Sequence, residues 1–120
     1  MDKIESREDY LEAILFLIRD GKNPKSIDVA RRLNFSKPSV SIAMKKLREE
    51  NLIVIDEKGF ISLTPLGEEV ANKTLEKHLF LKELFIKAGV DELTAENTAC
   101  GIEHHINDDT FEKIRKFLNK

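Results

Sequence analysis

The feature that most constrains the fold is a change of hydrophobic period near residue 51. Before it, apolar residues recur with helical spacing in two short segments, one following Ser26 and one following Ser36. Only Asn34-Phe35-Ser36 separates them. After it, the apolar runs 52–55 and 60–63 flank four turn residues that end in glycine, which is typical of a β-hairpin. Helix, short turn, helix and hairpin in this order predict a winged helix-turn-helix.

Helical patterns also flank this motif. Residues 5–20 are predicted to form a helix whose apolar stripe is Leu11, Ile14, Leu15 and Ile18. Thr64-Pro65 predicts the start of a long helix that runs to about Ala88, because threonine caps helices and proline suits their first position. Two further helices are expected, one over 91–106 and one capped by Asp109. Ser26 and Ser36 are the predicted caps of the two central helices.

The second half of the long helix is apolar almost all the way round. This half contains Leu79, Phe80, Leu81, Leu84, Phe85 and Ile86. Such a helix has to be buried on two sides. In a chain of 120 residues, one of these sides is expected to contact a second copy of the protein.

Composition restricts the class of protein further. The chain has one cysteine, which excludes an internal disulfide framework and suits a reducing cytosol. No apolar run approaches the roughly 20 residues of a membrane-spanning helix. The first ten residues are too acidic and polar for a signal peptide. We therefore expect a small soluble protein of the cytoplasm.

Charge is distributed unevenly along the chain. The net charge of −2 argues against a purely electrostatic nucleic-acid binder. Nevertheless, residues 24–50 carry seven basic against three acidic side chains, whereas residues 91–112 carry seven acidic side chains and no Lys or Arg. The first segment therefore suits a polyanion and the second suits cations. Alternatively, both segments are solvent-exposed helix faces with no charged partner, which would explain the same distribution of charge.

The second helix of the helix-turn-helix is the predicted recognition helix. Such a helix enters the major groove, where side chains near its N-terminus reach base edges and neighbouring lysines hold phosphates. Ile42 is expected to contact a thymine methyl group. The predicted DNA-binding residues are Ser36, Lys37, Pro38, Ser39, Ser41, Ile42, Lys45, Lys46 and Lys58. A helix pair in an unrelated α-helical protein is the alternative.

A second group of residues suits a metal ion. Cys100, Glu103 and His104 have the spacing i, i+3, i+4, which brings them within ~5–6 Å on one helix face. Thiolate, carboxylate and imidazole together make a three-ligand half-site. Asp9 and Glu12 lie one turn apart on the first helix, away from its apolar stripe. Taken singly, each of these residues is better explained as packed or solvated, and His78 on the long helix is equally well explained in that way. The coincidence of three ligand types nevertheless favours a metal site.

These motifs together resemble the DtxR/MntR family of metal-dependent transcriptional repressors, over nearly the whole chain. The pieces EDYLEAI, GVDE and GIEHHI are similar to the manganese-responsive branch, as is the lack of a C-terminal SH3-like domain. The resemblance implies the metal ligands Asp9, Glu12, His78, Glu103 and His104. Cys100 departs from that branch and matches the iron-responsive one, which in turn has Met where this chain has Asp9.

The resemblance also implies architecture and function. It predicts a mainly α chain, with a winged helix-turn-helix DNA-binding domain at 1–64 and a helical metal-binding and dimerisation domain at 65–120. It implies a homodimer on double-stranded operator DNA that represses metal-uptake genes. The implied ion is Mn²⁺ or Fe²⁺, with Zn²⁺ or Co²⁺ possible in vitro, at one strong site and a weaker second one.

Other functions remain open at this point. A carboxylate-bridged di-iron enzyme would need Glu-x-x-His pairs on facing helices, and the chain has neither these nor another catalytic motif, so no enzyme is expected. A metal-independent regulator could use Cys100 as a redox switch. A winged-helix module could instead dock proteins through the acidic 91–112 surface. His105 points 100° away from His104 and is not required in a metal site.

Overall fold

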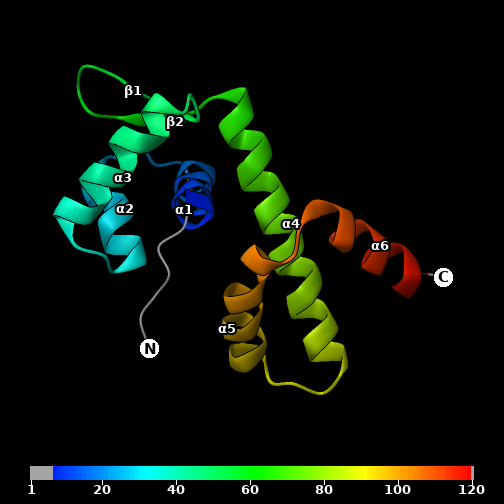
Figure 1. Cartoon of the computed structure of the whole chain (residues 1–120). Coiled ribbons are helices and arrows are strands. Elements are labelled where there is room, and N and C mark those ends of the chain that lie inside the picture. Colours follow the sequence, from blue (N-terminus) through cyan, green and yellow to red (C-terminus); the bar gives the residue numbers. More distant parts are fainter. Residues whose placement is uncertain (1–6, 120) are drawn as a thin grey trace. The chain divides into compact units, whose positions relative to one another are not determined.

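The computed structural model describes residues 7–119, which divide into two compact units at Asn72 and Lys73 (Figure 1). Helices make up most of these residues, and one small antiparallel sheet accompanies them. The predicted fold class, a mainly α chain that begins with a winged helix-turn-helix, is confirmed. The predicted helix start at residues 5 and 6 lies outside the described range. No helix within 7–119 combines the length and the apolar character that crossing a membrane requires.

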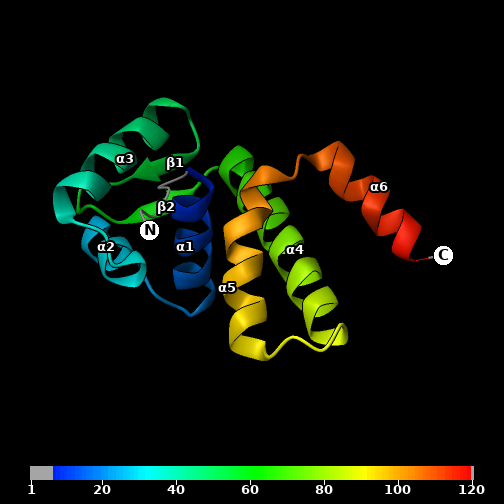
Figure 2. The ribbon, with the colours of Figure 1, turned by 60° about the horizontal axis from the view of Figure 1, so that its bottom comes forward.

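The first unit is the winged helix-turn-helix. It contains α1 (Arg7–Arg19), α2 (Ser26–Leu33), α3 (Lys37–Glu49), β1 (Ile53–Ile55), β2 (Ile61–Leu63) and the start of α4 (Pro65–Lys87). α1 packs against α2, α3 and β2 (Figure 2). The core side chains with at most 3% exposure include Leu11, Ile14, Val29, Val40, Met44, Leu47, Ile53 and Ile61. Burial of each such chain stabilises the unit by roughly 1.5–3 kcal/mol before entropic costs.

The predicted apolar stripe of α1 is correct except at one end. Leu11, Ile14 and Leu15 are buried, but Ile18 is 37% exposed. The buried face of α1 also includes Tyr10, Ala13 and Leu17. Its centre is therefore rotated relative to the predicted stripe, and Leu17 takes the inward position in the last turn.

The turn between α2 and α3 depends on a left-handed residue. Asn34 has φ = 57°, a conformation that asparagine tolerates better than most residues. Ser36 then caps α3, as predicted, because its hydroxyl accepts a hydrogen bond from the Ser39 amide at 3.3 Å. The predicted cap of α2 is wrong: Ser26 is already helical, and Lys25 precedes it. The Asp28 carboxylate accepts the Lys25 amide at 2.8 Å, so Asp28 satisfies the helix start in place of Ser26.

The wing is a short hairpin with a closed turn. Ile53 pairs with Leu63 and Ile55 with Ile61, close to the predicted strands. Asp56 Oδ1 accepts hydrogen bonds from the amides of Lys58 and Phe60, each at 2.9 Å. These bonds between the Asp56 side chain and nearby amides hold the turn in one conformation.

The junction between the wing and α4 leaves no room for a side chain. Thr64 caps α4, since its hydroxyl accepts the Gly67 amide at 3.0 Å and donates to the Asn51 carbonyl at 2.8 Å. A Cβ atom built on Gly67 would lie 1.9 Å from the carbonyl oxygen of Leu52. Glycine at position 67 therefore lets the first turn of α4 lie directly against the backbone that leads into the wing.

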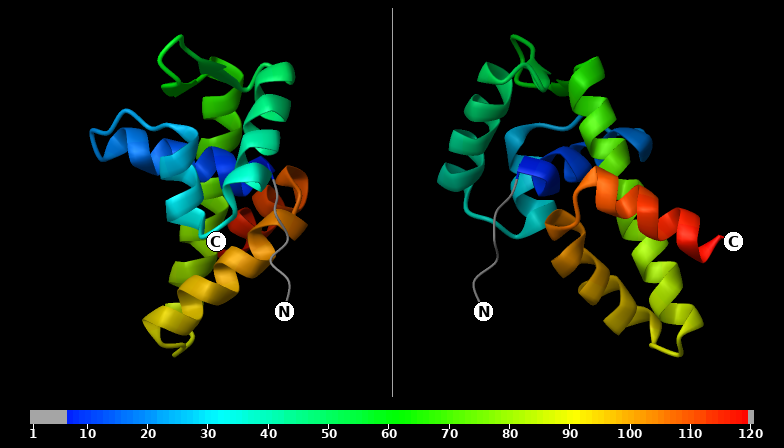
Figure 3. Two further views of the ribbon diagram at one scale, coloured as in Figure 1. Left: turned by 90° about the vertical axis from the view of Figure 1, so that its left-hand side faces the viewer. Right: turned by 45° about the vertical axis from the view of Figure 1, so that its right-hand side comes forward.

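The second unit contains the rest of α4, then α5 (Glu92–Ile102), the 3₁₀ turn η1 (Glu103–His105) and α6 (Asp108–Leu118). The chain turns back after α4 and enters α5 (Figure 3). The single helix predicted over 91–106 is wrong, because the chain tightens into η1 at Glu103. The cap predicted at Asp109 is also wrong. The Asn107 side chain accepts the Thr110 amide at 2.7 Å, so the cap of α6 lies two residues earlier than predicted.

Large apolar side chains of the second unit lie on its surface. Leu79 is 54% and Ile86 44% exposed, although both belong to the nearly all-apolar half of α4. The other exposed members are Leu93, Ile102, Phe117 and Leu118. The single chain thus leaves part of α4 uncovered, and apolar side chains grouped on one unit favour a protein contact.

We expect Gly67→Ala to destabilise the metal-free protein by about 1–3 kcal/mol, because the new methyl group overlaps a backbone oxygen that cannot rotate away. Ordinarily a Gly→Ala change within a helix stabilises it by up to ~1 kcal/mol. Urea unfolding followed by circular dichroism measures the difference.

Gly101→Ala is the matched control. Gly101 is helical, and no described atom lies within 4 Å of a Cβ atom built there. This variant should therefore be as stable as the wild type or more so. Equal stability of both variants would contradict the steric role assigned to position 67.

Candidate functional site

The exposed face of α3 carries most of the predicted DNA-binding residues. Ile42 is an exposed apolar residue on this face, at 70% exposure. Seven others are also exposed: Ser36, Lys37, Pro38, Ser41, Lys45, Lys46 and Lys58. Ser39 is half-buried. Lys58 lies at the tip of the wing. Of the other eight residues, Ser36 is the cap of α3 and seven lie within its first ten residues.

Ile42 stands between two shallow hollows of the first unit. One hollow is lined by Arg7, Tyr10, Ser39, Ile42, Ala43, Lys46, Leu47 and Glu50. The other is lined by Ser26, Ser41, Ile42, Met44, Lys45, Arg48 and Ile55. A projecting apolar side chain with a lysine on each flank suits a groove that offers methyl groups inside and phosphates at its edges.

Two of the predicted serines already have a structural role. The Ser36 hydroxyl donates to Ser39 Oγ at 2.8 Å and accepts from the Ser39 amide. Ser36 therefore holds the first turn of α3 in place. Arg48 was not predicted from the sequence, yet it lines the same hollow as Lys45. Its spacing of three residues from Lys45 was the available signal.

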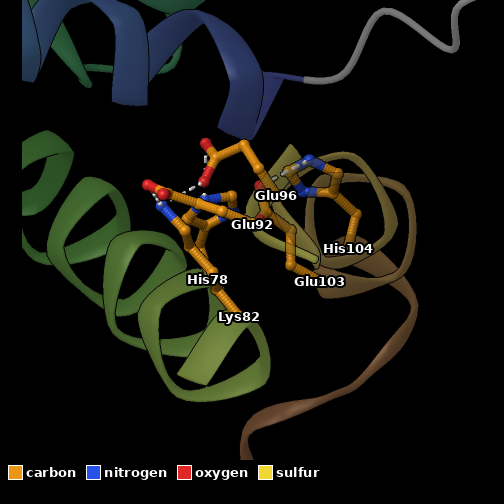
Figure 4. A network of polar contacts seen from close by, with 6 residues as sticks. All are labelled: His78, Lys82, Glu92, Glu96, Glu103 and His104. Atoms are coloured by element: carbon orange, nitrogen blue, oxygen red, sulfur yellow. Dashed lines mark hydrogen bonds and ion pairs between the residues drawn. The ribbon is translucent and has the colours of Figure 1, made fainter. Parts of the chain in front are cut away.

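The centre of the second unit is a buried carboxylate between two imidazoles. Glu103 has no exposed surface. Its Oε2 lies 2.7 Å from Nδ1 of His78, which α4 supplies. Its Oε1 lies 3.3 Å from Nε2 of His104, the next residue in η1. Figure 4 shows both contacts converging on Glu103.

His78 is held by a carboxylate on each side of its ring. Besides Glu103, it meets Glu96 of α5, with 2.9 Å between Nε2 and Oε1. The hydrogen bond to Glu103, opposed in part by burial and aided by Glu96, raises the pKa of His78 from 6.5 to about 9. Burial tends to raise the pKa of Glu96, but the hydrogen bonds from Lys82 and His78 outweigh it and hold that pKa below its usual value. In the metal-free protein His78 is therefore a cation at neutral pH.

A buried lysine holds η1 in position. Lys77 is 6% exposed and neighbours His78 on α4. Its Nζ donates to the Ile106 carbonyl at 2.8 Å and pairs with Asp108 Oδ1 at 2.9 Å. The Lys77 ammonium lowers the pKa of Asp108. Because Ile106 and Asp108 directly follow η1, this pair fixes the segment that carries Glu103 and His104.

The structure places the remaining predicted ligands on two elements. Cys100 is an exposed cysteine outside any disulfide, in the last turn of α5, and its Sγ lies within 4.8 Å of a Glu103 carboxylate oxygen. Asp9 and Glu12 lie one turn apart on α1, in the first unit. His105 is exposed, as expected of a residue that the metal site does not need.

Sequence reasoning missed Glu96 and Lys82. Glu96, Cys100 and Glu103 follow one another with the spacing i, i+4, i+7. Lys82 follows His78 by four residues. Helical spacing alone could therefore have placed Glu96 beside the predicted ligands. Lys82 Nζ lies 3.0 Å from Glu96 Oε2 and 3.7 Å from Glu92.

The donor atoms fit a divalent metal ion. Glu103 Oε1 accepts a hydrogen bond from no described residue, although the side chain is fully buried. A buried carboxylate oxygen in that state is costly unless a cation completes its environment. Oxygen from Glu103 and nitrogen from His78 and His104 suit Mn²⁺, Fe²⁺ and Zn²⁺ alike.

Comparison with known families identifies both units. Residues 2–61 match the N-terminal DNA-binding domain of the iron-dependent repressors. Residues 64–120 match the metal-binding and dimerisation domain of the same repressors. The chain belongs to the iron-dependent repressor family. It is a metal-dependent, DNA-binding transcriptional repressor, and the family predicted from the motifs is confirmed.

Individual members support this assignment. The repressor is 35% identical over 118 residues to an HTH-type transcriptional regulator of Methanocaldococcus jannaschii, covering 97% of this chain and 94% of that one. It is 33% identical to the transcriptional regulator MntR of Escherichia coli, covering 94% and 73%. The structure of the manganese regulator SloR superposes with a TM-score of 0.84 at 27% identity. That match covers 98% of this chain but 55% of SloR, so the repressor spans about half of SloR's length.

The raised pKa of His78 predicts how the stability of the metal-free repressor depends on pH. The folded-state pKa of about 9 exceeds the unfolded value of 6.5, so the contribution is complete below pH 6.5 and is lost as the pH rises through about 9. It amounts to at most about 3 kcal/mol, at ~1.4 kcal/mol per pKa unit. Urea unfolding in chelator at a series of pH values measures it.

The His78→Gln variant isolates this effect. The difference in unfolding free energy between wild type and variant should shrink as the pH rises across that window. His105→Gln is the control, because His105 is exposed and should leave the pH profile of the wild type unchanged. A wild-type advantage over His78→Gln that stays constant across the window would contradict the assignment.

Proposed function

We propose that this repressor responds to Mn²⁺ or Fe²⁺, binds double-stranded operator DNA as a homodimer and controls genes for metal-ion uptake. The observation that carries the proposal is the fully buried Glu103 carboxylate with an imidazole at each oxygen, in a member of the iron-dependent repressor family. A cytoplasmic location follows from this role, since the protein has to reach both DNA and the cell's metal pool.

The proposed ligands are Asp9, Glu12, His78, Cys100, Glu103 and His104. Carboxylate oxygens and imidazoles are donors that Mn²⁺ and Fe²⁺ accept. The Cys100 thiolate shifts the preference toward Fe²⁺, Co²⁺ and Zn²⁺, and it would bridge two Mn²⁺ ions poorly. We therefore propose one strong metal site and a weaker second one.

Metal would act by linking two parts of the chain. In this proposal residues 1–64 bind DNA and residues 65–120 bind metal and dimerise. Asp9 and Glu12 belong to the first part and the other ligands to the second. An ion held by both would favour one arrangement of the parts over others, which is a population shift of typically ~1–3 kcal/mol.

In a homodimer, the arrangement of the two parts of each chain determines the distance between the two recognition helices. Two recognition helices on one face of B-DNA need a separation of ~34 Å to enter successive major grooves. The exposed apolar side chains of α4, α5 and α6 support a homodimer formed through the second unit. Metal would thus raise DNA affinity without adding any contact to a base.

The central test is fluorescence anisotropy on the promoter DNA upstream of the repressor's own gene. We expect tight binding with Mn²⁺ or with Fe²⁺ under anaerobic conditions, and weak binding in chelator. Asp9→Ala and Glu103→Ala should each lose the metal response, because each removes a charged ligand. His105→Ala should keep it. Metal stimulation that survives both ligand substitutions would exclude the proposed site.

A second test concerns the recognition helix. Replacing Lys45 and Lys46 by alanine removes two lysines from each subunit of the proposed homodimer. It should therefore reduce the slope of log K against log salt by about 4, since each phosphate contact contributes roughly 0.9. The slope is measured by repeating the titration over a range of salt concentrations with saturating metal.

Lys113→Ala serves as the control for the loss of a lysine outside the recognition helix. Lys113 is exposed on α6, where it pairs with Asp109, and it lies outside the recognition helix. Its removal should leave the salt slope unchanged. A double Lys45, Lys46 variant with the wild-type slope would show that these lysines do not touch phosphates.

A further inference from the structure

The ring of His78 faces two carboxylates from different elements. Nδ1 lies 2.7 Å from Glu103 of η1, and Nε2 lies 2.9 Å from Glu96 of α5. Figure 4 shows Glu96 and Glu103 on opposite edges of the ring. Both distances are in the range of charge-assisted hydrogen bonds.

A metal ion can replace the proton at only one of these nitrogens. The other nitrogen must keep its proton and needs an acceptor, because a neutral imidazole has one donor and one lone pair. The remaining ligands of the second unit lie on the Glu103 side: His104 meets Glu103 at 3.3 Å, and Cys100 Sγ lies within 4.8 Å of its carboxylate. The ion is therefore expected at Nδ1.

We propose that Glu96, held by Lys82, is a positioning residue that accepts the Nε2 proton of His78 and thereby leaves the Nδ1 lone pair for the metal ion. The inference rests on the proposed metal-binding function and deepens it. Glu96 would not touch the ion. It would fix the tautomer and the rotation of the ring, the role that carboxylates commonly play behind metal-bound histidines.

Lys82 makes the arrangement specific. Its Nζ binds Glu96 Oε2 at 3.0 Å, while Glu96 Oε1 faces His78. One oxygen is thus occupied by the ammonium and the other is directed at the imidazole. Glu92 also lies near Lys82, at 3.7 Å, but its side chain is 82% exposed and makes no contact with His78 among the described residues. It provides a nearby carboxylate without the proposed role.

The test compares the Mn²⁺ affinity of five proteins by competition with a fluorescent chelator. Glu96→Ala should bind Mn²⁺ roughly 10–100-fold more weakly than wild type, the usual loss when such a partner is removed. Glu96→Gln should recover most of this loss, because the amide oxygen can accept the same hydrogen bond. Lys82→Met should lose a few-fold, and Glu92→Gln should match the wild type.

A spectroscopic readout separates positioning from a general loss of structure. In ¹⁵N-histidine-labelled protein loaded with diamagnetic Zn²⁺, His78 should show one tautomer, with its proton on Nε2 and Zn²⁺ on Nδ1. Glu96→Ala should show mixed tautomers or a broadened His78 signal. Thermal unfolding in chelator confirms that each variant is folded before its affinity is compared.

The outcomes distinguish the inference from the proposed function. Wild-type protein that binds neither Mn²⁺ nor Zn²⁺ would overturn the proposed function and the inference with it. Wild-type protein that binds metal while Glu96→Ala binds equally well would overturn the inference alone. So would a His78 proton on Nδ1 in the Zn²⁺ form, or an equal loss in Glu96→Ala and Glu92→Gln, which would indicate a general charge effect.

Discussion

The second unit depends on the burial of one charged group. A carboxylate with no exposed surface is costly to fold unless cations or hydrogen-bond donors surround it. His78 satisfies one carboxylate oxygen of Glu103, whereas Oε1 accepts no hydrogen bond from a described residue, and this need fixes where the other elements must lie. α4 has to present His78 to η1, and the Lys77 ammonium has to hold the residues that follow η1. The proposed metal site would therefore use side chains that already belong to the packing of the unit.

The same pairing gives the metal-free protein a defined state. A proton on His78 supplies positive charge at the Glu103 carboxylate when no ion is present. Metal binding would then exchange one cation for another within a site that is already assembled.

Local sequence patterns predicted the elements well where backbone chemistry decides them. Ser36, Thr64 and the turn ending in Gly59 gave the starts of α3 and α4 and the wing, because caps and turns depend on neighbouring residues. The prediction failed where tertiary contacts decide. The helix expected to reach Ile106 tightens at Glu103, whose carboxylate is buried against α4, and no local pattern signals that contact. The cap at Asn107 was missed because two aspartates follow it and are equally good capping residues.

The proposed metal site also has features that local sequence predicts and features that only tertiary contacts decide. Spacing along one helix placed Cys100, Glu103 and His104 together, since residues three and four apart are neighbours. Spacing cannot indicate which atom of His78 faces Glu103, nor that Glu96 and Lys82 complete the other edge of the ring. Those facts depend on how α5 returns along α4. All six predicted ligands, Asp9 and Glu12 among them, remain predictions.

The closed turn of the wing has a thermodynamic consequence for DNA association. Asp56 already binds the amides of Lys58 and Phe60, so the hairpin tip is ordered before it meets a partner. Ordering a flexible loop would cost about 1–2 kcal/mol for each backbone residue that is immobilised. Here that cost is already included in folding, so the phosphate contact proposed for Lys58 would restrict mainly the Lys58 side chain. A wing ordered in this way would lose little backbone entropy on meeting DNA.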